Sequence, residues 1–515
     1  MQHARMGWFL IILLLGIFSL TAKEPSSAKI KAVYNSLNPR SLSQHLAFYE
    51  LYPQTFEGKQ ALQEAWKMLG VELPSNGTSS LPTLPTTLDA LLSLVNRPPD
   101  QPPLSLTNEE LDGIERIGSR LANRRLKGHA AKTEQEVLAL PPEEIDLARG
   151  LLLSQLADLP DHFSQIRSYE ASLDLMAMQI LARLSPQASH KEKILAINAF
   201  IFEEMGFRFP PHSVYAKDID LYTFLPSVLD SRQGVCLGVS ILYHCLAQRL
   251  DLPLETITPP GHIYIRYRQD NEVINIETTA RGIHLDSEEY LGIETRSLQE
   301  RNIKDVIGMA HYNHAALYWH QKDYQKALNA YKKALPYLPE DLLLKELMAY
   351  NYLFVGEEAE GKRLLFAVKD YLPEYAIVKQ NIAEDYIHGE VDAEGIKALF
   401  MQVDENRESI LEKKTALEKV VEKYPKFRAG IFGLAVAWLQ LHRFGEALIQ
   451  LEKYHQIDPG DPSVEYYLAA IYTERLDYNK AWVHLKFAEQ LVNSRQHNPK
   501  ALKQLRKELS RLSPE

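Results

Sequence analysis

Apolar residues recur with the spacing of one helix face through most of the N-terminal half of the chain. Thr107 and Glu110 have the spacing of a capping box, which marks the start of a helix. Between residues 73 and 106 the pattern gives way to proline, serine and threonine, which predicts a linker interrupted by one helix near 87–95. We expect the other helices at 41–69, from 107 onward, and at 143–156, 164–184 and 191–204.

The pattern changes after a continuous apolar, helix-like run from Cys236 to Leu250. Short runs with strand-like alternation follow it at 254–257, 263–267 and 273–276. Helices first and a small antiparallel sheet afterwards are typical of an α+β domain.

The last two-fifths of the chain repeat themselves with a period of 34 residues. Ala315 and Tyr318 recur as Ala349 and Tyr352, and Pro425 recurs as Pro459. Small residues let paired helices pack closely, aromatic residues fill the space between them, and proline ends the second helix. The pattern resembles the tetratricopeptide repeat and implies a curved, all-α solenoid with a concave face. Units are expected near 308–341, 342–375, 428–461 and 462–495, with a degenerate unit at 376–427.

The first residues have a different character. His3 and Arg5 precede an apolar run from Trp8 to Leu20, which the small residues Thr21 and Ala22 follow. This order is typical of a secretory signal, and the run is short for a membrane span, which needs roughly 20 apolar residues. We expect export to the periplasm or beyond, with an uncleaved membrane anchor as the alternative.

Composition narrows the function classes. The chain of 515 residues is long enough for several domains, and 24% charged with 45% hydrophobic residues is typical of globular proteins. The net charge of −10 argues against a nucleic-acid partner. Two cysteines cannot form a disulfide framework, so packed cores must supply the stability.

One of those cysteines, Cys236, follows Gly234 and opens the apolar helix-like run. A thiol in the first turn of a helix is favoured as a thiolate by the helix dipole and the free backbone N–H groups. His262 starts the next-but-one strand-like run, and Glu277 ends the run after it. Neighbouring antiparallel strands would bring this acid to the histidine, which it could then orient and stabilise as a cation.

Other interpretations of these residues have to be weighed. A lone cysteine is commonly buried as a small hydrophobe, and Cys245 fits that description. Zinc bound by the two cysteines is unfavourable, because residues nine apart on a helix lie about 13 Å apart along its axis; His244 is likewise about 12 Å from Cys236. The remaining candidates are weaker: Tyr215, Tyr222 and Phe224 as groove walls, Arg232 as a carboxylate ligand or turn residue, Gln233 as an oxyanion donor, and His311, His314 and His320 as surface positions.

The stretch from about 191 to 290 resembles the bacterial transglutaminase-like superfamily of papain-fold domains. The resemblance rests on residues 198–207, on Arg232-x-Gly234-x-Cys236, on Pro259-Pro260-Gly261-His262 and on 274–278. It implies acyl transfer through a thioester, with Cys236 as nucleophile, His262 as general base and acid, and Glu277 as orienting acid. Two residues depart from the usual pattern: the acid is Glu277 where aspartate is more common, and Tyr264 stands where many active relatives carry a larger ring.

These observations predict an exported cysteine-dependent acyltransferase or amide hydrolase that acts on proteins or peptides, with the repeat groove recruiting a substrate or partner. The alternative is an inactive papain-like scaffold that works only through the repeats. No cofactor and no metal ligands are expected. The expected domain order is signal 1–22, helical segment 23–72, linker 73–106, helical region 107–190, transglutaminase-like domain 191–300 and repeat solenoid 301–515.

Overall fold

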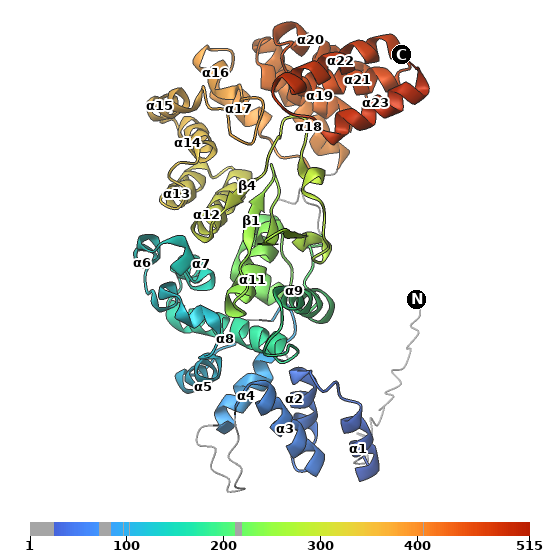
Figure 1. Cartoon of the computed structure of the whole chain (residues 1–515). Coiled ribbons are helices and arrows are strands. Elements are labelled where there is room, and N and C mark those ends of the chain that lie inside the picture. Colours follow the sequence, from blue (N-terminus) through green and yellow to red (C-terminus); the bar gives the residue numbers. More distant parts are fainter. Residues whose placement is uncertain are drawn as a thin grey trace, which may run out of the picture.

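The computed structural model describes residues 25–71, 84–95, 97–101, 104–211, 219–404 and 406–514. The predicted signal segment, much of the predicted linker and Tyr215 lie outside these ranges. Figure 1 shows an elongated chain with the first helices at one end, a small sheet in the middle and the last helices at the other end. No helix of the described ranges is both long and apolar enough to cross a membrane.

Helices fill the region before the sheet, as the apolar spacing predicts. Thr107 and Glu110 form the expected capping box, and the predicted helix at 191–204 ends in a π-helical turn, Ala199–Glu204. The helices are α1 Ser27–Asn35, α2 Leu42–Leu51, α3 Phe56–Met68, α4 Leu84–Val95, α5 Asn108–Gly118, α6 Glu134–Ala139, α7 Leu147–Gln155, α8 His162–Leu181, α9 His190–Asn198, α10 Leu225–Ser231 and α11 Cys236–Arg249.

The sheet has four strands in the order β3-β2-β1-β4, and every neighbouring pair is antiparallel. The strands are β1 Glu255–Thr258, β2 Tyr264–Gln269, β3 Glu272–Ile276 and β4 Gln299–Arg301. The helix α11 packs against β2. The α+β prediction is therefore confirmed, with β4 as an edge strand that the sequence pattern did not indicate.

Antiparallel helix pairs form the C-terminal part, and the predicted repeat is confirmed. The four alanines Ala315, Ala349, Ala435 and Ala469 are fully buried, because each lets its helix approach a neighbour closely. The degenerate stretch holds the shorter helices α16 and α17 and the longer α18 (Figure 1). The bounds are α12 Ile303–His320, α13 Tyr324–Ala334, α14 Leu342–Phe354, α15 Glu358–Val368, α16 Ile382–Ile387, α17 Ala393–Leu399, α18 Arg407–Lys423, α19 Arg428–Gln440, α20 Phe444–Ile457, α21 Pro462–Glu474, α22 Tyr478–Ser494 and α23 Lys500–Leu512.

The prediction that the histidines of α12 are surface residues is wrong. His311 is only 6% exposed, His314 stacks against Tyr318, and His320 is half-buried. The reason is that α12 packs against the central domain as well as against its partner α13, so few of its positions face solvent.

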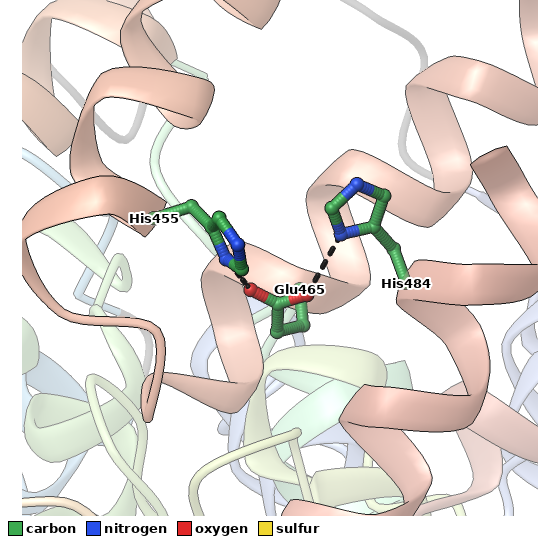
Figure 2. Close-up of side chains that lie close together, drawn as sticks. All are labelled: His455, Glu465 and His484. Atoms are coloured by element: carbon green, nitrogen blue, oxygen red, sulfur yellow. Dashed lines mark hydrogen bonds and ion pairs between the residues drawn. The ribbon is translucent and has the colours of Figure 1, made fainter.

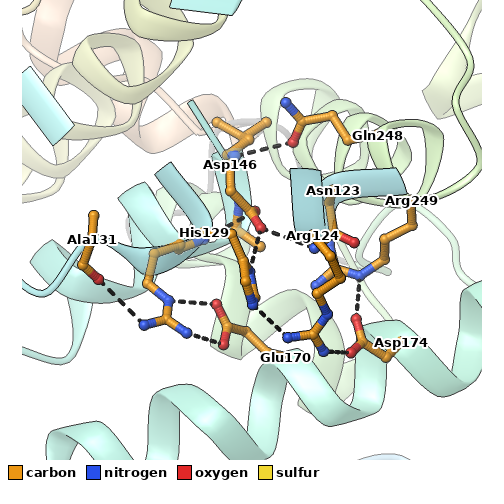
Figure 3. A network of polar contacts seen from close by, with 12 residues as sticks. Asn123, Arg124, His129, Ala131, Asp146, Glu170, Asp174, Gln248 and Arg249 are labelled. Atoms are coloured by element: carbon orange, nitrogen blue, oxygen red, sulfur yellow. Dashed lines mark hydrogen bonds and ion pairs between the residues drawn. The ribbon is translucent and has the colours of Figure 1, made fainter. Parts of the chain in front are cut away.

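A buried polar network joins α11 to the helices before it (Figure 3). The Nε of Arg249 donates to Oδ1 of Asp174 over 2.8 Å, and neither side chain has any exposed surface. Arg124 donates to the other oxygen of Asp174. Next to this pair, Gln248 donates to the carbonyl of Ile145 over 2.8 Å. The C-terminal end of α11 is thus held by charge and hydrogen bonding, while its other end carries Cys236.

Asp146 is the second centre of this network. Its carboxylate caps α7 and accepts from Asn123 over 2.9 Å and from His129 over 3.0 Å. Burial raises the pKa of Asp146, but the hydrogen bond from His129 and the charge of Arg249 outweigh it, and the pKa lies below its usual range. The carboxylate therefore stays ionised inside the core, where charged partners compensate it.

Candidate active site

Cys236 is the first residue of α11, as the sequence predicts. The sharp turn before it is made by Arg232, which has a left-handed φ of 54°. The role of Gly234 is steric and not conformational, because a Cβ at this position would lie only 2.7 Å from Cγ2 of Val239. The backbone N–H of Val235 donates to the carbonyl of Tyr222 over 3.1 Å, which fixes the helix start in place.

The start of α11 has no side-chain cap, because its N-cap residue is Val235. Uncapped N–H groups at a helix start carry a partial positive charge and point along the helix axis. They are available to a substrate oxygen beside the thiol of Cys236, which is partly exposed.

His262 lies one residue after Gly261, whose φ of 71° allows the tight turn into β2. Glu277 directly follows β3, and the β2–β3 register pairs Ile265 with Ile276. This register brings the two side chains together, and Nε2 of His262 lies 2.7 Å from Oε2 of Glu277. The other ring nitrogen is left for the thiol of Cys236, whose interaction with the imidazole is one of the causes that raise the pKa of His262.

Glu277 accepts further hydrogen bonds that the sequence analysis missed. Its Oε1 accepts from the backbone N–H of Thr279 over 3.1 Å and from the hydroxyl of Thr279 over 2.6 Å. Its Oε2 accepts from the hydroxyl of Tyr290 over 2.6 Å. Burial raises the pKa of Glu277, but the bonds from His262, Thr279 and Tyr290 outweigh it and lower the pKa to about 2.

The imidazole of His262 is held mainly in its charged form. Burial lowers its pKa, but the hydrogen bonds to Cys236 and Glu277 and the charge of Glu277 outweigh burial and raise the pKa to about 9. A protonated imidazole beside a thiol favours the thiolate. The three residues that the sequence singled out therefore lie together, with a charged acid and a charged imidazole, as a cysteine nucleophile needs.

Tyr290 also shapes the site through its ring. It stacks on His262 at 5.6 Å between ring centroids and on Tyr264 at 4.7 Å, both at 18° between the ring planes. Tyr264, the position where many active relatives carry a larger ring, therefore supports the catalytic histidine candidate through a second tyrosine.

The second cysteine has a different environment. Cys245 is fully buried in α11, and burial raises the pKa of its thiol. His244, its neighbour in sequence, bonds Thr256 over 2.7 Å, and burial lowers the pKa of that imidazole to about 4. Both residues lie in the core, as expected for Cys245.

A cavity of about 720 Å³ opens beside Cys236 and His262. One wall belongs to the central domain and includes the turn Pro259-Pro260-Gly261. Arg301 and Asp341, which form an ion pair at 3.1 Å, also line it. The repeats contribute Met309, Tyr312, Asn313, Leu338, Leu343 and Tyr375 to the lining.

The weaker candidates from the sequence are placed elsewhere. Arg232 donates to the carbonyls of Arg97 and Met205, so it binds backbone oxygens and no carboxylate. Phe224 packs edge-on against His314. Of the described residues, Phe224, Tyr222 and Gln233 are not among those that line the cavity. Asp220 does line it, and burial raises the pKa of that carboxyl to about 6.

The electrostatic coupling in the site gives a direct prediction for Glu277→Gln. The substitution keeps the shape of the side chain but removes the charge that helps to hold the proton on His262, so the pKa of that imidazole should fall from about 9. NMR titration of a histidine-labelled protein measures the midpoint, and Glu289→Gln, an exposed change, serves as the control. An unchanged midpoint in Glu277→Gln would contradict the assigned contact.

Comparison with known proteins identifies the family that the central part of the chain matches. Residues 167–306 match the model of the family described as transglutaminase-like superfamily. Two curated relatives, UPF0162 proteins of Xylella fastidiosa strains Temecula1 and 9a5c, are each 28% identical over 97 residues, which is 19% of this chain and 34% of the relative. The match thus spans about a third of the relatives' length.

Solved structures with a similar helical part include MamA from Desulfovibrio magneticus RS-1, at 15% identity and a TM-score of 0.19, covering 36% of this chain and 96% of that one. Another is YrrB, described as a TPR protein with an unusual peptide-binding site, at 17% identity and a TM-score of 0.21, covering 39% and 92%. At such TM-scores these likenesses add nothing to the helix pairs and the 34-residue period. The chain therefore combines a transglutaminase-like domain with tetratricopeptide-type helical repeats.

Proposed function

We propose that this protein is an exported, cysteine-dependent acyl-transfer enzyme that acts on amide groups of proteins or peptides. The observation that carries the proposal is the hydrogen-bonded pair of His262 and Glu277 beside Cys236 at the start of α11, where the thiol and the imidazole line one cavity. The low pKa of Glu277 and the raised pKa of His262 support it, since they describe a charged acid–imidazole pair.

The chemistry follows from these roles. The Sγ of Cys236 forms a bond to the amide carbonyl carbon, and the carbonyl oxygen faces the N–H groups at the start of α11. His262 gives its proton to the departing amide nitrogen, which leaves as ammonia or an amine, and a thioester remains. Water or an amine then gives a proton to His262 and attacks the thioester, which releases Sγ. Glu277 keeps the ring oriented throughout.

The repeat wall of the cavity supports a peptide-like substrate. Apolar and aromatic residues from α12 and α14 line the same cavity as the thiol, so a chain bound there would contact both domains. Repeats that supply one wall of a catalytic cleft can select the sequence next to the reacting amide.

Leu343→Asp tests the repeat wall. Leu343 is 41% exposed, so the change should leave stability intact while it removes an apolar contact and adds a charge in the cleft. We expect KM to rise about tenfold with kcat nearly unchanged. Leu372→Asp is the matched control, because Leu372 is 48% exposed and is not among the described residues of the lining. Equal effects of both substitutions on KM would show that the repeat residues of the cavity do not contact the substrate.

Export is part of the same proposal and rests on the N-terminal segment alone. N-terminal sequencing of the protein recovered from cell fractions tests it. A chain that begins near Lys23 in the periplasm or medium supports export with cleavage, an intact chain in the membrane fraction supports an anchor, and an intact chain in the cytosol contradicts the proposal.

The acyl-transfer assignment is tested with glutamine-containing peptides in the presence of hydroxylamine. Wild-type protein should release ammonia and form peptide hydroxamates, and Cys236→Ala should do neither. Peptide cleavage dependent on Cys236 would assign the same chemistry to a backbone amide. Absence of every Cys236-dependent product would favour the inactive scaffold.

A further inference from the structure

The last repeats contain a cluster of three side chains that the acyl-transfer chemistry does not use. His455 of α20 and His484 of α22 converge on Glu465 of α21, as Figure 2 shows. The Nδ1 of His455 lies 2.5 Å from Oε1 of Glu465, and the Nδ1 of His484 lies 2.8 Å from Oε2. The ligand atoms of all three lie within 4.8 Å of one another.

Glu465 stands where the preceding repeat has an apolar side chain. Glu465 has no exposed surface, and the residue one period earlier is the fully buried Ile431. One period before His455 is Val421, which is 7% exposed. Ile431 shows that an apolar side chain can fill this position in a neighbouring repeat, and burying a carboxylate is costly unless charge compensates it.

We infer that His455, Glu465 and His484 form a binding site for a divalent transition-metal ion of the zinc class, with the fourth position open to water. Two imidazoles and one carboxylate are a ligand set that zinc commonly takes in proteins. Neighbouring ligand atoms around tetrahedral zinc lie about 3.3 Å apart, so small side-chain rotations suffice to admit the ion.

The exposure of the two histidines and the orientation of the His484 ring agree with this assignment. The side chain of His455 is 33% exposed and that of His484 is 15% exposed, so an ion can enter from solvent while the carboxylate stays buried. The ring of Tyr472 stacks on His484 at 5.6 Å and fixes its plane. The bound imidazoles would carry their remaining proton on Nε2.

A second histidine–acid cluster is a useful contrast. His129, Asp146 and Glu170 are equally close to one another, but Arg149 donates to Glu170 over 2.6 Å and Arg124 contacts His129. Guanidinium groups already neutralise those acids and would repel a cation. Glu465, by comparison, forms its ion pairs with the two histidines.

The ion would join three helices that belong to successive repeats. Repeat arrays derive much of their stability from the interfaces between neighbours, so one ion at this junction would stiffen the C-terminal end of the solenoid. This role is independent of the activity of Cys236.

Equilibrium dialysis of the full chain against ZnCl₂, followed by elemental analysis, tests the site. Wild-type protein should retain one more zinc ion than His484→Ala, with affinity more than about 100-fold weaker in the variant. Glu465→Ile, which copies the residue of the preceding repeat, should stay folded by circular dichroism and also lose the ion. His388→Ala, which removes an exposed histidine, and Cys236→Ser, which removes the partly exposed thiol outside this cluster, should keep it.

Thermal unfolding gives a second readout. Zinc should raise the midpoint of the wild type and of His388→Ala but not that of His484→Ala, and Mg²⁺ should have no effect, because it prefers oxygen ligands. Equal zinc content in wild type and His484→Ala, or retention of the ion by folded Glu465→Ile, would overturn the inference and leave the histidines as neutralising partners of a buried carboxylate.

Discussion

In the wild type, the rate of Cys236 alkylation by iodoacetamide is expected to change little between pH 5.5 and 8. In His262→Ala, the rate should fall about tenfold for each unit by which the pH is lowered across this range. The pKa of His262 is raised to about 9 and that of Glu277 is lowered to about 2, so both charges persist across this range. In the variant the imidazolium beside the thiol is gone, so the rate should rise with pH as it does for an ordinary thiol.

The difference between the two profiles should be largest at the acidic end of this range. A paired thiolate is intrinsically less nucleophilic, which offsets part of this difference, so the slope of the profile is the quantity to compare. The direction follows from His262: because its pKa is raised, the imidazolium persists across the neutral range and is lost as the pH rises through about 9. The wild-type profile should therefore bend again near pH 9.

Two controls make the result decisive. Cys245 is fully buried in the same helix, so it should stay unlabelled while the protein is folded. His388→Ala removes an exposed imidazole far along the chain and should leave the profile unchanged. A wild-type rate that rises only near pH 8.5 and ignores His262 would contradict the enzyme proposal and favour a scaffold that acts through its repeats.

The sequence alone could predict that Cys236, His262 and Glu277 lie close together, because their positions follow local rules. A thiol after a turn opens a helix, and residues at the ends of neighbouring antiparallel strands meet in space. Thr279 could have been found in the same way, since it lies two residues after Glu277. Tyr290 could not, because it reaches Glu277 from a 3₁₀ turn outside the periodic elements.

Packing between segments that are distant in sequence could not be predicted from local patterns either. The 34-residue period identified the helix pairs and their buried alanines, but it says nothing about which face of a pair meets another domain. The cavity wall from α12 and α14 and the burial of His311 both arise from that contact. The strand β4 was not predicted because its three residues are too few to show an alternating pattern.

Asp174→Ala is expected to lower the opening free energy of α8 and α11 by about 3–5 kcal/mol. The substitution leaves the fully buried guanidinium of Arg249 without its partner and also removes a partner of Arg124. An unpaired charge in the core costs far more than the loss of the attraction itself. Hydrogen exchange of the amides in these two helices measures the change locally, which avoids treating a multidomain chain as two-state.

The double variant Asp174→Leu with Arg249→Met separates the two contributions to that cost. If the loss in Asp174→Ala comes from a stranded charge, replacing both partners with apolar side chains should recover most of the protection. If it comes from lost packing, the double variant should be no better. Arg363→Met, which breaks an exposed pair with Glu360, should leave exchange unchanged.

The same experiment connects the N-terminal helices to the site. Arg249 ends the helix that Cys236 begins. Loss of the Asp174–Arg249 contact at the C-terminal end of α11 should therefore increase the mobility of the turn that positions the thiol at its N-terminal end. Asp174→Ala should then steepen the pH profile of Cys236 alkylation toward that of His262→Ala, and the double variant should restore it. A loss of protection with an unchanged profile would show instead that the polar network stabilises the domain without positioning the thiol.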